Sequence, residues 1–155
     1  MNPLEVQDEA LRIETLRQYE VLDTAPDSAL DDIIRLAAQI CNTPVAALSL
    51  IASDRILLKS RFGVETPDLP LGSLPCETTI LGSSVYEIQD APLDTKFAPR
   101  GILLDGQPYR FYAGAPVTTL GGVALGALFV LDVAPRTLTP AESSALSSLS
   151  RQITT

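Results

Sequence analysis

The chain is 155 residues long, with 46% hydrophobic and 19% charged residues and a net charge of −8, which predicts a single globular domain with its own core. Its basic residues are scattered singly, whereas binding a phosphate backbone requires clustered Lys and Arg, so nucleic acid is not an expected partner. The sequence contains no histidine, which excludes Ser-His-Asp and Cys-His catalysis and zinc sites that rely on imidazole.

Two amphipathic helices are predicted at the N-terminus. Apolar side chains recur every three or four positions in residues 4–21, and Pro26 follows the end of this pattern. The second helix begins at Asp27 or Ser28 and ends near Cys41, whose place on the apolar stripe predicts a buried packing thiol. The first stripe is Val6, Ala10, Ile13 and Leu16, and the second is Leu30, Ile33, Ile34, Ala37, Ala38 and Cys41.

The expected location of the protein is the cytoplasm. The N-terminal segment is acidic and polar, which is not the pattern of a signal peptide. Apolar runs such as residues 44–48 are too short to cross a bilayer, so no membrane partner is expected. The sequence has only two cysteines and no secretion signal, which favours a reducing compartment.

The middle of the chain predicts strands separated by loops. Residues 45–51 are apolar on both faces, as in the centre of a covered sheet, and residues 56–62 alternate polar and apolar side chains. Residues 63–75 are rich in proline and glycine and are expected to be loop. A short helix containing Cys76 is then expected to end at Gly82.

The remaining elements are an edge strand, a hairpin and a helix. The edge strand is predicted at residues 84–89 and is followed by an irregular segment at residues 90–108. Residues 109–119 and 123–132 predict a long hairpin. Residues 139–142 form a capping box with proline at the first helical position. The final helix would present Ala145, Leu146, Leu149 and Ile153 on one face.

This order of elements predicts an α+β fold. Strands joined mostly by hairpins imply an antiparallel sheet, with the helices gathered on one face. The irregular segments, residues 63–83 and 90–108, are left to cover the other face. A sheet covered by long loops is a common place for ligand binding, so a pocket is expected there.

Six stretches of the sequence carry a family resemblance. They are EALRIETLRQYEVLDTAPDSALDDIIRLAAQIC, PVAALSLIASDRILLKSRFG, SLPCETTIL, IQDAPLDTKFA, YRFYAGAPV and GGVALGALFVLDVAPRTLTPAE. Together they cover nearly the whole chain and resemble the GAF domains of bacterial signalling proteins, in particular those at the N-terminus of histidine kinases and diguanylate cyclases.

The resemblance implies a PAS-related antiparallel sheet of about six strands, helices on one face and a loop-covered pocket on the other. It also implies a non-enzymatic sensory module that binds a small molecule, forms a homodimer through its terminal helices and acts on an output domain, either a histidine kinase or a diguanylate cyclase. The single domain would then comprise a dimerisation helix at residues 1–22, a sheet and pocket core at residues 23–136 and a signalling helix at residues 137–155.

Cys76 is open to three interpretations. If Ser73 caps the short helix, Cys76 lies at its third position, where the helix dipole favours a thiolate, although the adjacent Glu77 opposes it. Bilin-binding GAF domains attach their cofactor through a cysteine normally followed by histidine, but here Glu77 follows. Free methionine sulfoxide reductases are GAF domains that use a second cysteine, whereas Cys41 is predicted to face the core. Bilin attachment and redox catalysis are therefore alternatives to the favoured role, a small pocket-lining side chain.

The other candidate ligand-binding residues lie on predicted strands or on the loops expected to cover the pocket. A carboxylate, a guanidinium and a phenol would supply the few polar contacts of an apolar cavity. In the structural alternatives, Asp90 caps the turn at residues 94–96, Arg110 is solvated and Phe97 packs in the core. The candidates are Asp90, Phe97, Arg110, Tyr112 and Ser49.

Overall fold

The computed structural model describes residues 9–17, 28–119 and 121–153. Residues 9–17 are helical and lie inside the helix predicted at residues 4–21. The remainder of that prediction lies outside the described residues, as do Val6 and the predicted break at Pro26.

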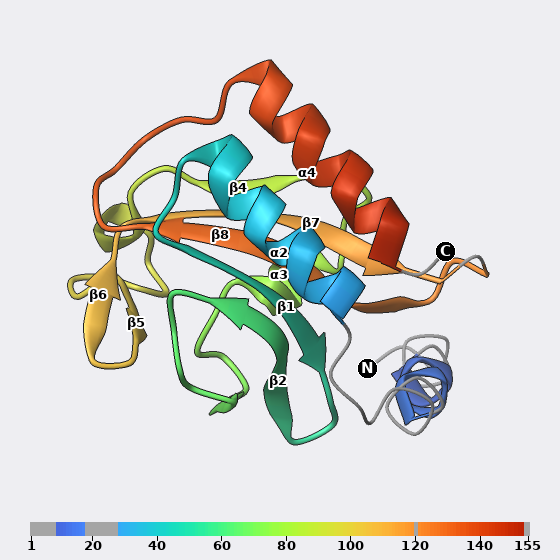
Figure 1. Cartoon of the computed structure of the whole chain (residues 1–155). Helices are drawn as coiled ribbons and strands as arrows, with labels where there is room; N and C mark the ends of the chain where they lie inside the picture. Colours follow the sequence, from blue (N-terminus) through green and yellow to red (C-terminus); the bar gives the residue numbers. More distant parts are fainter. Residues whose placement is uncertain (1–8, 18–27, 120, 154–155) are drawn as a thin grey trace.

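A six-stranded antiparallel sheet forms the centre of the fold (Figure 1). The strand order is β3-β2-β1-β8-β7-β4, so β4 is an edge strand as predicted. This arrangement confirms the α+β class and the expected long hairpin, in which Phe111–Thr118 pairs with Ala124–Asp132. The strands are β1 (Val45–Ile51), β2 (Arg55–Phe62), β3 (Asp68–Pro70), β4 (Tyr86–Ile88), β7 (Phe111–Thr118) and β8 (Ala124–Asp132).

Two helices, α2 (Ser28–Cys41) and α4 (Pro140–Ile153), cover one face of the sheet and pack against each other (Figure 1). Cys41 is buried in this core, as predicted. Ile33 is only half-buried, because the face of α2 that meets the sheet is centred on its neighbours. The apolar face of α4 packs against the core of the same chain. Leu146 is buried there, and Leu149 and Ile153 pack against the same hydrophobic cluster. The buried residues of α2 are Leu30, Ile34, Ala37, Ala38 and Cys41.

The opposite face is covered by irregular segments and one short helix, α3 (Cys76–Thr79). The expectation of continuous loop over residues 63–75 is wrong, because β3 pairs there with the edge of β2. Proline at its end is compatible with an edge strand, which needs fewer backbone donors. Hydrogen bonds across the strands therefore determine this element more than its own residue preferences.

Residues 90–108 are also more regular than predicted. They contain a 3₁₀ turn, η1 (Ala91–Leu93), and a second small sheet of β5 (Ile102–Leu104) with β6 (Gln107–Tyr109). Tyr109 therefore belongs to this hairpin and not to the long strand β7. Asp105 and Gly106 at its tip have φ values of 53° and 74°, the left-handed conformation that two-residue hairpin turns require.

Candidate functional site

A buried polar cluster of Ser49, Cys76, Thr79 and Tyr112 lies between α3 and the centre of the sheet. None of the four residues is more than 1% exposed. The Tyr112 hydroxyl lies 2.7 Å from Thr79 Oγ1 and 3.7 Å from Cys76 Sγ. On β1, Ser49 Oγ accepts a hydrogen bond of 3.1 Å from the Ala127 amide and donates to the Ala127 carbonyl at 3.2 Å. Ser49 also lies close enough to the Cys76 thiol to affect its pKa. The structure thus brings together three of the six predicted site residues.

Tyr112 is the largest member of the cluster and fixes its geometry. Its ring stacks on Phe129 at a centroid distance of 5.7 Å and tilts against Tyr86 at 6.4 Å. Its hydroxyl end lies over Gly114, where a Cβ atom would collide with the phenol. Gly114 therefore leaves the room that the Tyr112 hydroxyl occupies.

Cys76 is the first residue of α3, not the third as predicted. The residue before the helix is Pro75, which makes no side-chain capping bond, and the Ser73 hydroxyl instead donates to the Pro70 carbonyl. Burial raises the pKa of the Cys76 thiol to about 11, although hydrogen bonds from Ser49 and Tyr112 partly oppose this shift. The thiol is therefore neutral at physiological pH, and a helix of one turn does not offset its desolvation.

The cluster supplies neutral hydrogen-bonding groups and no charge. Among the described residues, every buried side-chain nitrogen and oxygen has a hydrogen-bond partner. Thr79 Oγ1, for example, also donates to the Pro75 carbonyl at 3.1 Å. A ligand on this face must therefore displace α3 or its flanking loops before it can reach these groups.

Asp90 and Arg110 form a separate pair at the surface. Arg110 Nε and Nη2 donate to the two carboxylate oxygens of Asp90 at 2.9 and 2.7 Å. The Arg110 guanidinium holds the pKa of the Asp90 carboxyl below its usual value. Asp90 makes no side-chain capping bond, so that structural alternative is wrong. The Arg110 side chain is 47% exposed, so it is both solvated and paired. Phe97, by contrast, packs against the core under the loops and lies on the same side of the sheet as Tyr112.

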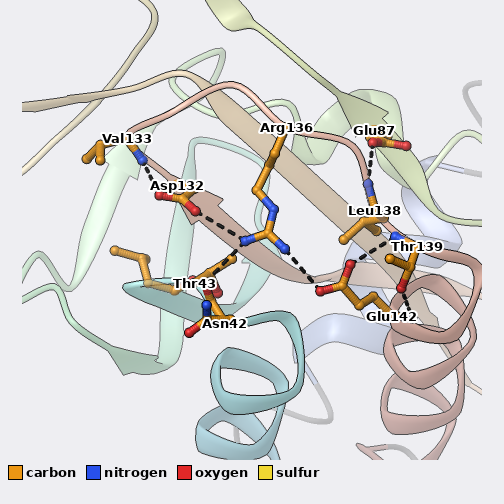
Figure 2. Close-up of polar contacts among 10 residues, drawn as sticks. Asn42, Thr43, Glu87, Asp132, Val133, Arg136, Leu138, Thr139 and Glu142 are labelled. Carbon is orange, nitrogen blue, oxygen red and sulfur yellow. Dashed lines mark hydrogen bonds and ion pairs between the residues drawn. The ribbon is translucent and has the colours of Figure 1, made fainter.

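Arg136 joins three parts of the fold and was not anticipated from the sequence (Figure 2). Its guanidinium donates to Asp132 at the end of β8, to Glu142 in α4 and to the Asn42 carbonyl after α2, at 3.2, 3.0 and 3.2 Å. It also lies 5.4 Å above the centre of the Phe111 ring. The sequence did carry a signal for these ion pairs. Arg136 lies between two acidic residues, Asp132 and Glu142, just before and within the first turn of the predicted helix.

The capping box at the start of α4 is confirmed. Glu142 accepts a hydrogen bond of 2.9 Å from the Thr139 amide, and its own amide donates to Thr139 Oγ1 at 3.1 Å. Two further bonds tie the preceding segment to the edge of the sheet. The Leu138 amide donates to Glu87 on β4 (Figure 2), and the Arg136 amide donates to the carbonyl of Gln89, the residue that follows β4. The start of α4 is thus attached to β4, β8 and α2.

The described residues contain neither a membrane-spanning helix nor a metal-binding cluster. No helix among them is long and apolar enough to cross a bilayer. No group of three or more Cys, Asp or Glu side chains in the described ranges is placed to hold a metal ion.

The chain is similar in sequence to a known family of domains. A sequence model of the GAF domain matches residues 25–155. The chain belongs to the GAF domain family. This GAF domain is also 32% identical over 130 residues to a cyclic di-GMP phosphodiesterase of Pseudomonas aeruginosa, a match that covers 84% of the chain but only 22% of that enzyme.

Solved structures share the fold at low sequence identity. The GAF domain of an Acinetobacter phosphoenolpyruvate-protein phosphotransferase superposes with a TM-score of 0.67 at 18% identity, covering 99% of this chain and 92% of that one. A free methionine-R-sulfoxide reductase of Neisseria meningitidis, solved with its substrate, has a TM-score of 0.60 at 17% identity, covering 92% and 86%. At such identities the likeness concerns the fold alone.

Proposed function

We propose that this GAF domain is a non-enzymatic sensory module that binds a small molecule on the loop-covered face of its sheet. The observation that carries the proposal is the neutral cluster of Ser49, Cys76, Thr79 and Tyr112, which holds α3 closed over the sheet. These four residues provide hydroxyl and thiol groups within an apolar surrounding, the composition of a small-molecule site. When α3 moves, the same groups become available to a ligand.

The chemistry of Cys76 favours binding over catalysis. Attachment of a bilin and reduction of free methionine sulfoxide both require a thiolate that reagents can reach. Cys76 is fully buried with a raised pKa. Cys41 is buried in the core on the opposite face of the sheet, so it is poorly placed to resolve an oxidised Cys76.

The signal would leave the domain through β7 and α4. Tyr112 faces the cluster, while its neighbour Phe111 faces the helices and lies under the Arg136 guanidinium. Movement of β7 when α3 opens would therefore act on the junction that holds the start of α4. We propose that the module works as a homodimer through its terminal helices and controls an output domain, a histidine kinase or a diguanylate cyclase. The phosphodiesterase of P. aeruginosa, of which the chain spans about a fifth, supports an association with signalling proteins.

Native mass spectrometry of the protein purified from its own host tests binding and dimerisation together. We expect a dimer carrying a small molecule that is released on denaturation, because the cluster offers hydrogen bonds without a reactive group. Leu11→Glu, on the terminal helix at 57% exposure, should yield monomers, whereas Leu93→Glu, at 83% exposure on η1, should leave the dimer intact.

Three results would contradict parts of this proposal. A bare monomer at tens of micromolar would oppose both ligand binding and dimerisation. A covalent adduct that persists after denaturation and is lost in Cys76→Ser would favour the bilin alternative. Turnover of free methionine sulfoxide with dithiothreitol, abolished by Cys76→Ser, would favour the reductase alternative.

A further inference from the structure

A cleft lies on the loop segments around residues 92–110, and none of its lining residues belongs to the buried cluster. It has a volume of about 440 Å³, and its lining includes Pro92, Pro99, Arg100, Gln107, Pro108 and Arg110. The volume is within the range of about 300–1,000 Å³ that is typical of small-molecule sites.

The cleft carries local positive charge on a protein whose net charge is −8. Asp90 neutralises Arg110 through Nε and Nη2, which leaves the Nη1 donors of Arg110 without a partner among the described residues. The guanidinium of Arg100 forms no ion pair within the described part of the chain. The cleft thus has about one uncompensated positive charge and several unused N–H donors, which suits a single anionic group.

The walls favour an anion with an apolar body. Three of the lining residues named above are prolines, whose rings are rigid and cannot donate a backbone hydrogen bond. Such walls offer van der Waals contact to a flat or compact hydrocarbon group. A small inorganic dianion would leave the apolar walls unused and would exceed the available positive charge.

We propose that this cleft binds a small organic monocarboxylate, with its carboxylate between Arg100 and Arg110 and its apolar part against the prolines. The site is distinct from the loop-covered face and does not depend on the sensory role of that face. It lies close to the start of α4 in the hydrogen-bond network, because the Arg110 amide donates to the Asp132 carbonyl, and the Asp132 carboxylate accepts from Arg136. A ligand bound in the cleft would therefore act on the contacts of Arg136 that hold the start of α4.

Amide NMR titration of the full 155-residue chain with benzoate tests the proposal. We expect benzoate to shift the amides of residues 100–110 with a dissociation constant on the order of 1–10 mM, the affinity that a fragment of this size can reach. Benzamide has the same shape without the charge and should leave these amides unshifted. Arg100→Gln should weaken benzoate binding about tenfold, since it removes a charge-assisted hydrogen bond.

The control variant is Arg35→Gln, which removes an exposed arginine on α2, remote in sequence from the cleft, and should bind benzoate like the wild type. The spectrum of each unliganded variant confirms that it is folded. The proposal is overturned if benzoate shifts no amide in residues 100–110 at about 50 mM, well above the expected dissociation constant. Equal shifts with benzamide, or unchanged binding in Arg100→Gln, would also overturn it. Stronger binding of inorganic phosphate at the same amides would replace the carboxylate assignment.

Discussion

Tyr112→Ala is expected to lower the free energy of unfolding by about 3–5 kcal/mol, the usual effect of truncating a buried aromatic side chain. The substitution removes the ring from its contacts with Phe129 and Tyr86 and leaves a cavity beneath α3. It also removes the hydroxyl that lies against Thr79 and Cys76. Urea denaturation followed by circular dichroism measures the change.

Tyr112→Phe separates the hydroxyl from the ring. We expect this variant to lose about 1–2 kcal/mol, because it removes hydrogen bonds in a buried site but preserves the packing. The matched control is Tyr86→Phe, since the Tyr86 hydroxyl makes no hydrogen bond within the described residues and its loss should cost less than about 0.5 kcal/mol. Equal effects of the two Tyr→Phe substitutions would mean that the cluster contributes no specific stability to the closed position of α3.

Arg136→Met is expected to lower the free energy of unfolding by about 2–3 kcal/mol. The side chain is 23% exposed and its partners Asp132 and Glu142 are 18% and 15% exposed, so these ion pairs are partly shielded from water. Removing the cation leaves two carboxylates and the Asn42 carbonyl without their shared donor, which costs more than the loss of a solvated pair. Thermal and urea denaturation both measure this difference.

Arg55→Met is the control for Arg136→Met. It breaks the ion pair with Asp68 on the sheet edge, where both side chains are about half exposed, at 52% and 46%. Exposed pairs contribute about 0–1 kcal/mol, so this variant should be nearly as stable as the wild type. A similarly small effect of Arg136→Met would contradict the view that Arg136 holds the start of α4.

Strong periodic patterns made much of the fold predictable. The apolar stripe ending at Cys41, the almost entirely apolar β1 and the capping box from Thr139 to Glu142 each combine several residues that favour one structure. The short strand β3 was not predictable in this way, because its hydrogen bonds come from β2 and not from its own sequence. The hairpin of β5 and β6 did carry a local signal, since Asp105-Gly106 is a favoured two-residue turn, and this signal was missed.

The candidate site was predictable in its residue types but not in its grouping. Tyr112 and Cys76 were expected on one face, and the structure places them together. Thr79 was missed, although it lies one helical turn after Pro75 and Cys76, where its hydroxyl can reach Tyr112. The separation of Asp90 and Arg110 from the cluster depends on the 3₁₀ turn and on the pairing of residue 91 with residue 110, which no local pattern specifies.

The reactivity of Cys76 in the folded protein is the most direct test of the claim that this domain acts by binding and not by thiol chemistry. With a pKa of about 11, only about one thiol in a thousand would be ionised at pH 8 even if it were accessible. Both cysteines are fully buried and have raised pKa values. Titration with Ellman's reagent at pH 8 should therefore detect neither thiol in the native protein and both after unfolding in guanidinium chloride. Rapid reaction of one thiol in the native state, lost in Cys76→Ser but kept in Cys41→Ser, would contradict the account.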